Sequence, residues 1–368
     1  MNWDEYNRNL LDKCKDLGIP FSACFELTPF CNFKCNMCYV RLEPEQACEQ
    51  GKLLSTQQWI NIAKEARALG TTTLEITGGE ATTRRDFSVL YESFARMGFV
   101  INLRTNGYAI TGDILDLLIR YKPARIGITL YGASNETYQR VCGVSDGFSV
   151  VTRNIIALRD AGLRVHLTMT MTKENQNDVD ALNEWAAKNN LHIRAYGGLF
   201  NPIRGVNRSI DHLKIRYSDE ECEISDDMQF KPHEIENRSQ YMNPFWMCRG
   251  FGAMFCICWD GRMTLCNGMT YVWENPLMNS VETAYHSLYK KLRKLSRPEK
   301  CGTCQYIDYC ISCPTQIISE TGSINQTCEE ICRRARRRYK RELLISRTDN
   351  TYNADVSDLI CEEGEDEK

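Results

Sequence analysis

Three closely spaced cysteines stand near the start of the chain. Cys31, Cys35 and Cys38 lie in the run Cys-Asn-Phe-Lys-Cys-Asn-Met-Cys, directly after a short apolar stretch. A [4Fe–4S] cube has four irons, and a ferredoxin-type site supplies a cysteine to each of them. The next cysteine, Cys48, lies in a polar stretch, and no nearby pair completes a structural zinc site. The spacing therefore favours an iron–sulfur cluster with one iron open to another ligand.

Several motifs follow this triplet in order. They are Thr77-Gly78-Gly79-Glu80, then Arg104-Thr105-Asn106-Gly107, and then the segment 128–134 followed by Arg140 and Gly143. With the triplet, they resemble the radical SAM superfamily. That resemblance implies an open iron that binds S-adenosylmethionine, a cluster electron that cleaves it to a 5′-deoxyadenosyl radical, and glycines that let backbone carbonyls reach the methionine amino group. The cofactor-binding residues that it implies are Met37, Gly78, Gly79, Glu80, Asn106, Thr129 and Arg140.

Apolar, β-rich runs alternate with helical patterns between residues 22 and 196. This order predicts a parallel α/β sheet, and each motif follows a strand, at the edge where such folds place their sites. The resemblance sharpens the fold to a partial (β/α)6 barrel, followed by a small, irregular, cysteine-rich domain. The expected strands are 22–28, 72–77, 99–104, 125–130, 164–170 and 191–196, and the expected helices are 56–69, 87–97, 112–121, 148–161 and 177–189.

Composition limits the class of protein. The chain has 368 residues, 43% of them hydrophobic, which is enough for a large core, and a formal net charge of −3. Charges run through the first residues, and no apolar run has the length of a signal peptide or a membrane span. We therefore expect a cytoplasmic protein that binds no membrane. In a reducing cytosol, 19 cysteines favour metal binding over disulfides.

A second group of cysteines occupies the last third of the chain. Its order, and the spacing from Gly261 to Cys266, resemble the SPASM domain, except that Cys310 and Cys313 are separated by two residues instead of three. The resemblance implies two auxiliary clusters, hence three [4Fe–4S] clusters and S-adenosylmethionine as cofactors. One auxiliary set would be Cys248, Cys266 and Cys313 with Cys256 or Cys258, and the other would be Cys301, Cys304 and Cys310 with Cys328 or Cys332.

Two of these choices and one alternative stay open. We prefer Cys256, on the expectation that Cys258 lies on the opposite face of its strand, and we prefer Cys332 for its distance from Thr321-Gly322. A zinc ribbon over residues 301–313 is the alternative, because two Cys-x2-Cys pairs can bind four-coordinate zinc. Cys14, Cys24, Cys142 and Cys222 are expected to pack in cores. Cys142 is nevertheless the candidate catalytic thiol, since it follows Arg140 and could donate a hydrogen atom to a substrate radical.

The expected domain organisation follows from these motifs. An N-terminal helix (1–20) precedes the radical SAM barrel (21–200), and a bridging segment (201–247) leads to the SPASM domain with its basic C-terminal helix (248–347). An acidic tail of disordered composition (348–368) ends the chain.

The run of arginines and lysines at 333–341 bears on partners. It could be a solvated helix face or a docking site for an acidic peptide, while a single run without interleaved aromatics disfavours nucleic acid. Only residues 1–21 precede the first expected strand. Recognition of a leader peptide is therefore expected from a separate protein, the barrel face or this basic helix.

The motifs and their departures lead to one function. The chain is similar to SPASM maturases of ribosomally made precursor peptides, which implies hydrogen abstraction from a peptide residue and an external electron donor of flavodoxin or ferredoxin type. Two auxiliary clusters favour an oxidative crosslink, thioether or carbon–carbon, over epimerisation. Sulfatase-type maturation is disfavoured, because Asn267 stands where those relatives have an aspartate base and an amide cannot act as that base. A non-catalytic iron–sulfur electron carrier is the alternative from another class.

Overall fold

The computed structural model describes residues 3–110, 112–202, 209–215 and 242–343. The chain divides into two compact units. The first unit comprises Met1–Ile215 and Cys248–Leu295, and the second comprises Arg216–Met247 and Ser296–Lys368. The expected bridging segment lies mostly outside the described residues, as do Cys222 and the acidic tail.

The first unit is built on a sheet with the strand order β6-β5-β4-β3-β2-β1-β7-β8. All pairings are parallel except the antiparallel pair β7–β8. The predicted parallel α/β sheet is thus confirmed, and β4 has the predicted bounds. The strands are β1 (Ser22–Glu26), β2 (Thr73–Thr77), β3 (Val100–Thr105), β4 (Arg125–Leu130), β5 (Val165–Thr170), β6 (Ile193–Tyr196), β7 (Met254–Ile257) and β8 (Met263–Thr264).

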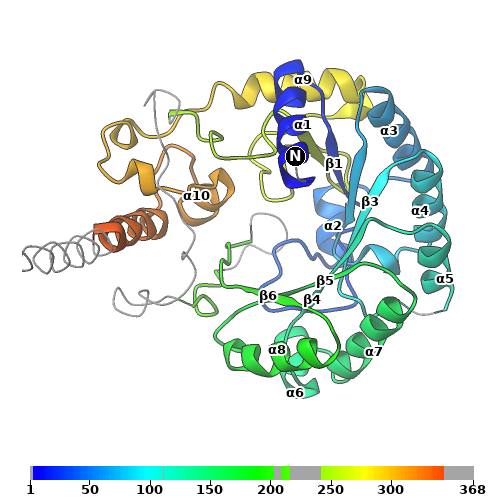
Figure 1. Cartoon of the computed structure of the whole chain (residues 1–368). Coiled ribbons are helices and arrows are strands. Elements are labelled where there is room, and N and C mark those ends of the chain that lie inside the picture. The colour runs from blue at the N-terminus through cyan, green and yellow to red at the C-terminus, as the bar shows by residue number, and fades with distance from the viewer. Residues whose placement is uncertain (1–2, 111, 203–208, 216–241, 344–368) are drawn as a thin grey trace, which may run out of the picture. The chain divides into compact units, whose positions relative to one another are not determined.

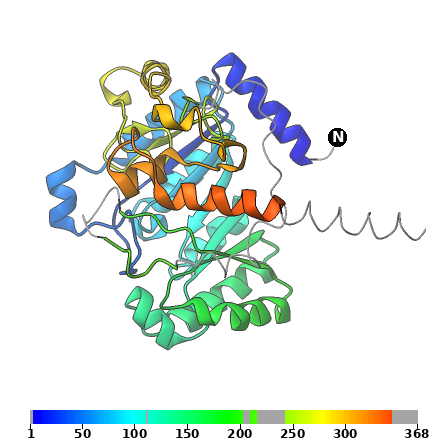
Figure 2. The same ribbon diagram turned by 90° about the vertical axis from the view of Figure 1, so that its left-hand side faces the viewer.

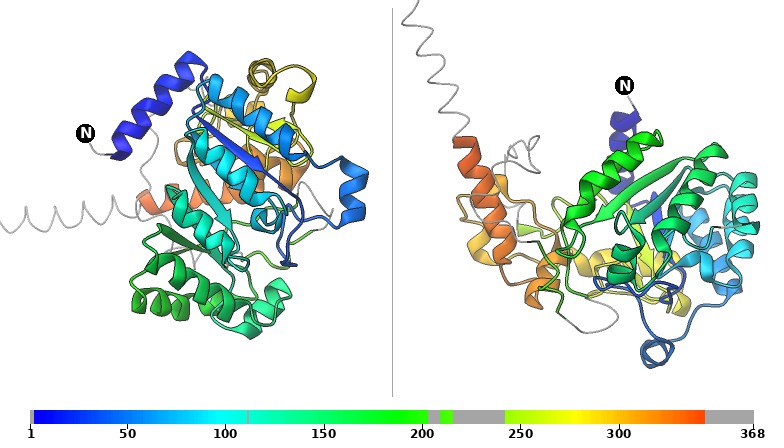
Figure 3. Two further views of the ribbon diagram at one scale, coloured as in Figure 1. Left: turned by 90° about the vertical axis from the view of Figure 1, so that its right-hand side faces the viewer. Right: turned by 90° about the horizontal axis from the view of Figure 1, so that it is seen from below.

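Helices connect the parallel strands and cover one face of the sheet (Figures 1 and 3). The ring of Phe25 on β1 lies 5.1 Å from that of Trp59 on α3 and 5.6 Å from that of Phe94 on α4. This outer face holds the apolar core of the unit. The helices are α1 (Trp3–Leu17), α2 (Pro44–Gln50), α3 (Thr56–Ala68), α4 (Phe87–Arg96), α5 (Asp113–Arg120), α6 (Asn135–Cys142), α7 (Gly147–Asp160), α8 (Val179–Lys188), α9 (Val281–Leu292) and, in the second unit, α10 (Pro314–Thr321).

The two faces of the sheet differ in composition. In β2, Leu74 and Ile76 are fully buried, whereas Thr73, Glu75 and Thr77 are only partly buried. The same alternation runs through β3 and β5, because successive strand residues point to opposite faces. We call the polar face, opposite the helices, the inner face.

Local sequence explains where the helices of this unit begin and end. The Ser55 side chain accepts from the N–H of Gln58, whose side chain returns a bond to the Ser55 backbone, and this capping box begins α3. Ser134 caps α6, and Gly143 ends it with a φ of 71°, a conformation that glycine adopts without a steric penalty. Helix α6, which was not expected, therefore has clear start and stop signals.

The chain returns to the first unit after β6. Strand β7 pairs with β1, with Cys256 opposite Cys24. Helix α9 then joins the outer layer, where the Val281 N–H donates to Glu65 Oε2 at 2.8 Å. These contacts explain why residues 248–295, expected in the C-terminal domain, pack with the barrel strands instead.

The second unit contains α10 and a helix over 329–343, coloured orange to red in Figure 2. Several arginines of the basic run are engaged within this unit. Arg334 Nη2 donates to Gln316 Oε1 at 2.7 Å, Arg338 Nη1 donates to the Tyr309 carbonyl at 3.1 Å, and Arg336 pairs with Glu329. The run therefore contributes to packing within the unit, which lowers its value as a peptide-docking surface.

No single helix within the described residues is both long and apolar enough to cross a membrane. Helices α6 and α7 reach the required length and hydropathy only when they are taken together, and they meet at a bend of 108°.

Candidate functional site

The cysteine triplet lies on the loop after β1, at the carboxyl edge of the sheet. Backbone N–H groups donate to two of its sulfurs, from Phe33 to Cys31 Sγ at 3.3 Å and from Arg41 to Cys38 Sγ at 3.2 Å. Burial raises the pKa of Cys31, and the charges of Glu80, Cys35 and Cys38 add to it. The three thiols are thus close together, and N–H···S bonds of this kind suit an iron–sulfur cluster. Such a metal centre would displace their protons when it binds.

The C-terminal turn of α6 holds this loop. The Lys34 N–H donates to the Cys142 carbonyl at 2.8 Å, and the Asn36 N–H donates to the Val141 carbonyl at 2.9 Å. Asn36 Nδ2 also reaches the Arg140 carbonyl and, at 3.0 Å, Glu174 Oε2. Sequence reasoning missed Asn36 and Glu174, since their partners lie over a hundred positions away.

The glycine pair after β2 allows the same loop to approach. A Cβ on Gly78 would lie 2.7 Å from the Thr28 carbonyl oxygen, and one on Gly79 would lie 2.3 Å from that of Phe30. Gly79 N–H donates to the Thr28 carbonyl at 2.6 Å. The absence of side chains therefore seats the loop against β2, while the predicted contact of the glycine carbonyls with a methionine amino group remains a prediction.

Glu80 joins the ends of β2 and β3. Its carboxylate, 1% exposed, accepts from the Thr82 hydroxyl at 2.6 Å, from the Thr105 hydroxyl at 2.9 Å and from the Asn106 N–H at 2.6 Å. Burial raises the pKa of this carboxyl, although these hydrogen bonds act in the opposite direction. Through these hydrogen bonds Glu80 fixes the backbone of the site.

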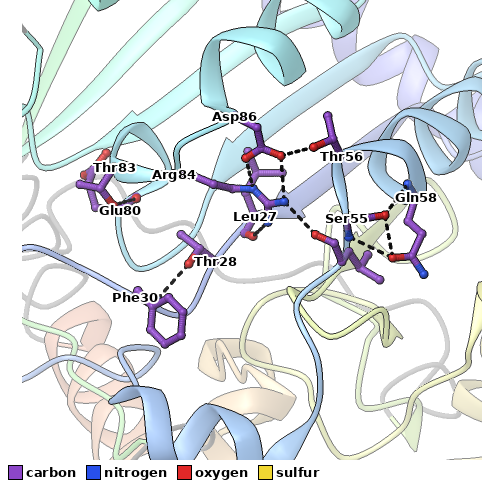
Figure 4. Close-up of polar contacts among 11 residues, drawn as sticks. Leu27, Thr28, Phe30, Ser55, Thr56, Gln58, Glu80, Thr83, Arg84 and Asp86 are labelled. Atoms are coloured by element: carbon purple, nitrogen blue, oxygen red, sulfur yellow. Dashed lines mark hydrogen bonds and ion pairs between the residues drawn. The ribbon is translucent and has the colours of Figure 1, made fainter.

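An arginine next to this motif fixes the start of the cysteine loop (Figure 4). Arg84 Nη1 donates to the Leu27 carbonyl at 2.7 Å, and Nη2 donates to the Leu54 carbonyl at 2.8 Å. Asp86 pairs with Arg84 Nε at 2.6 Å and accepts from the Thr56 hydroxyl. Arg84 thereby ties the end of β1 to the beginning of α3, and no motif had singled it out.

The other predicted cofactor residues lie around this edge. Asn106 Nδ2 donates to Asn32 Oδ1 at 2.8 Å and lies 3.7 Å from Cys31 Sγ. The Thr129 hydroxyl lies 3.3 Å from that of Thr168 on the inner face. Arg140 instead donates to the Glu174 carbonyl at 2.9 Å, and Met37 is buried within the loop.

Cys142, the predicted catalytic thiol, is fully buried behind the loop. The hydrogen bond between the Cys35 and Cys142 thiols raises the pKa of Cys35, as does burial, while the Tyr131 hydroxyl lowers it. The thiol thus contacts a candidate cluster ligand. Its role as a hydrogen-atom donor remains a prediction.

Cys256 and Cys258 lie on the same face, so the expectation of opposite faces is wrong. Their side chains hydrogen bond to one another, as two residues at positions i and i+2 of a strand can. Cys24 and Cys256 both donate to Asn267 Oδ1, at 3.0 and 3.2 Å. Cys24 was expected only to pack in a core, because nothing in the spacing reveals that β1 and β7 are neighbours.

The second unit gathers four predicted ligands. Burial and then the charges of Cys310, Cys301 and Cys304 raise the pKa of Cys332 to about 11. Cys328 is buried in an apolar cluster with Ile317 and Ile331, against which Cys310 packs. The choice of Cys332 over Cys328 therefore remains a prediction.

The other auxiliary set is divided between the units. Cys248, Cys256 and Cys266 belong to the first unit and Cys313 to the second, so this set remains a prediction. Within the described residues, no three or more histidine, cysteine, aspartate or glutamate side chains converge as they would on a single metal ion.

Residues 25–186 match the family model described as the radical SAM superfamily. This part of the chain is a radical SAM domain. The match covers the cysteine loop, the Gly78–Glu80 motif and strands β2 to β5, which together carry the site described above.

Relatives of the radical SAM domain extend the comparison. A probable GTP 3′,8-cyclase of Saccharolobus islandicus is 32% identical over 158 residues, which is 42% of this chain and 48% of that protein. The sporulation killing factor maturation protein SkfB of Bacillus subtilis is 25% identical over 262 residues, or 68% of this chain and 61% of SkfB. The chain thus spans about half to three fifths of these curated relatives.

A solved structure shows the same fold. SuiB of Streptococcus suis bound to the precursor peptide SuiA has a TM-score of 0.62 with this chain at 16% identity. The likeness covers 89% of this chain and 80% of SuiB. It extends well beyond the radical SAM domain and therefore includes part of the cysteine-rich region.

Proposed function

We propose that the protein is a radical SAM peptide maturase that forms an oxidative crosslink, thioether or carbon–carbon, in a ribosomal precursor peptide. The observation that carries this proposal is the loop of Cys31, Cys35 and Cys38, seated between the glycine pair of β2 and the end of α6. The similarity to SkfB, a sporulation killing factor maturation protein, and to SuiB, which binds the precursor peptide SuiA, supports the substrate class.

The residues of the loop fit the cofactors that this function needs. Cys31, Cys35 and Cys38 would hold a [4Fe–4S] cluster, and Asn106 and Thr129 would face S-adenosylmethionine. Such a cluster supplies one electron that cleaves S-adenosylmethionine into methionine and a 5′-deoxyadenosyl radical, which takes a hydrogen atom from the peptide. The protein's part is to seat the loop through the Glu80 N–H and the Arg84 guanidinium and to limit the access of water to its partly buried thiols.

Auxiliary clusters at the C-terminal cysteines would make the crosslink possible. Forming a crosslink removes a second electron from the substrate, and an auxiliary cluster held by Cys301, Cys304, Cys310 and Cys332 would accept it. The charges of Cys301, Cys304 and Cys310 act on Cys332, which supports the SPASM assignment. A cytoplasmic setting would supply the flavodoxin or ferredoxin that reduces the first cluster.

The test is anaerobic reconstitution of the full chain. Iron is counted, S-adenosylmethionine and dithionite are added, and 5′-deoxyadenosine is quantified. We expect about twelve irons, four for each cluster, and deoxyadenosine that disappears in Cys31→Ala but persists in Cys48→Ala, whose cysteine is exposed. About four irons would refute the auxiliary clusters, and a fully loaded protein that forms no deoxyadenosine would refute the enzyme.

A further inference from the structure

The inner face of the sheet carries a group of basic side chains. The Arg104 side chain on β3 is 42% exposed, and His166 on β5 and Arg194 on β6 are also exposed. They alternate with buried residues such as Leu103 and Leu167, which pack toward the helices. We call this group the arginine face, and its members are Arg104, Arg125, Arg164, His166 and Arg194.

These side chains lie close to one another. Partial loss of water around the imidazole, followed by the positive charges of all four arginines, lowers the pKa of His166. Strand register gives the same grouping, since Arg104 is paired with Gly127, and Gly127 is paired with His166. Residues from four strands therefore converge on one region of the inner face.

Gly127 makes room for one of the guanidinium groups. A Cβ at this position would lie 3.0 Å from both Cδ and Nη1 of Arg104. The bare backbone lets the Arg104 side chain lie across β4, toward His166. The face is therefore shaped to hold a cation over the strand.

The charges on this face are not balanced. Glu75 accepts from Arg104 Nε at 2.9 Å, and Glu26, at the edge of the face on β1, is fully buried. Arg125 Nε is buried without a hydrogen-bond partner among the residues that the structure describes. Cations that crowd together repel one another, and an unpartnered buried donor costs stability, so this arrangement favours a bound anion.

The face adjoins the candidate cofactor residues. Arg194 is paired in register with Thr168, whose hydroxyl meets that of Thr129 at 3.3 Å. A ligand held by Arg194 would lie two strands from Thr129, at the same level along the sheet. The position suits a substrate rather than a distant effector.

We propose that the arginine face binds acidic side chains of the substrate peptide next to the residue that is modified. This inference rests on the proposed function for the identity of the ligand as a peptide. Four neighbouring strands, about 4.8 Å apart, cover roughly 14 Å, which is close to two ~6.7 Å repeats of the alternate side chains of an extended peptide. Cations distributed over four strands match successive carboxylates on such a peptide better than they match a compact phosphate chain, which converging backbone N–H groups usually hold.

The experiment compares two probes on anaerobic, cluster-loaded protein. One is a short fluorescein-labelled peptide that alternates glutamate with leucine, and the other carries glutamine in place of glutamate. Fluorescence anisotropy should show binding of the acidic peptide only. Arg194→Gln should weaken it by about tenfold or more, since a hydrogen bond to a charged group is lost, and Arg194→Lys should restore part of the affinity.

A matched control separates this site from general attraction. Arg120→Gln removes the same charge from an exposed arginine of α5, in the helix layer, and should leave the affinity unchanged. Equal losses in Arg120→Gln and Arg194→Gln would overturn the inference, as would equal binding of both peptides. Displacement of the acidic peptide by GTP, or a raised KM for S-adenosylmethionine in Arg194→Gln, would overturn it in favour of a nucleotide or the cofactor carboxylate.

Measuring 5′-deoxyadenosine in the absence of peptide distinguishes this test from the test of the proposed function. Wild-type protein that cleaves S-adenosylmethionine but does not bind the acidic peptide would refute the arginine face alone. Loaded protein that forms no deoxyadenosine would refute the enzyme, whatever the peptide does.

Discussion

The outer and inner faces of the sheet in the first unit share the same strands but not the same chemistry. Leu74 and Ile76 of β2 pack under the helices, while Glu75 between them faces inward and pairs with Arg104. Parallel strands that are covered on both faces usually read as continuous apolar runs. Strands in which apolar and polar residues alternate, joined by helices, therefore indicate a sheet with helices on one face and a second face that is free to bind ligands.

The largest expected effect is a loss of activity, from a substitution in the cysteine loop at the carboxyl edge of the sheet. Cys35→Ala removes a cluster ligand, so deoxyadenosine formation should fall to background in the anaerobic assay. Cys142→Ala removes the thiol that hydrogen bonds with Cys35 and should still permit cleavage. If Cys142 donates a hydrogen atom to the substrate radical, the Cys142→Ala protein should release peptide without the normal modification, and mass spectrometry would detect this. Cleavage that survives Cys35→Ala would contradict the assigned ligand set.

On the outer face, the effect should be on stability. Leu103 is fully buried, and Leu103→Ala should lower the free energy of unfolding by about 3 kcal/mol through lost burial and a cavity. Asn102→Ala, one residue earlier on the inner face, should cost less than about 1 kcal/mol. Urea unfolding under anaerobic conditions measures both, and similar losses would mean that the two faces are equally packed.

A smaller loss of stability is expected at Glu80, a polar residue that is nevertheless buried. Glu80→Gln replaces an acceptor-only carboxylate by an amide, so one of the donors from Thr82, Thr105 or Asn106 loses its acceptor. The free energy of unfolding should fall by about 2 kcal/mol. Glu75→Gln removes an exposed ion pair and should change it by less than about 1 kcal/mol; a larger effect there would show that the inner face stabilises the fold.

The smallest effect should come from a single methyl group. Gly127→Ala pushes the Arg104 guanidinium away from β4 and should weaken acidic-peptide binding by up to about fivefold, which is less than about 1 kcal/mol. Gly198→Ala is the control, because nothing lies within 4 Å of a Cβ at that position. If the Gly127→Ala and Gly198→Ala proteins bind the acidic peptide with equal affinity, the position of Arg104 over β4 does not matter for binding.

Local sequence patterns predicted much of the fold. The bounds of β4 were correct, and β1 and β6 differed by two residues at one end, because short periodic runs between helices leave few other assignments. Strand β7 and helix α9 were missed as parts of the first unit. Their place depends on pairing with β1 and α3, which are over two hundred residues earlier in the chain.

The candidate site divides in the same way. The triplet was evident because Cys31, Cys35 and Cys38 are ligands within one short loop. Glu174 and Arg84 act through contacts with distant backbone, and no spacing reveals such partners. The error at Cys258 came from a misapplied strand period, and the thiol pair of Cys24 and Cys256 needed the register of β1 and β7.

The pairing of β1 with β7 also has a consequence for how the chain folds. During synthesis, every cofactor loop of the radical SAM domain is complete before β7 exists, and until then one edge of β1 has no neighbour. Contacts between residues so far apart close late and slowly, and an unpaired strand edge invites pairing with another chain. The first unit therefore becomes safe from aggregation only after its last strands have emerged, and the order of synthesis leaves the free edge of β1 exposed until then.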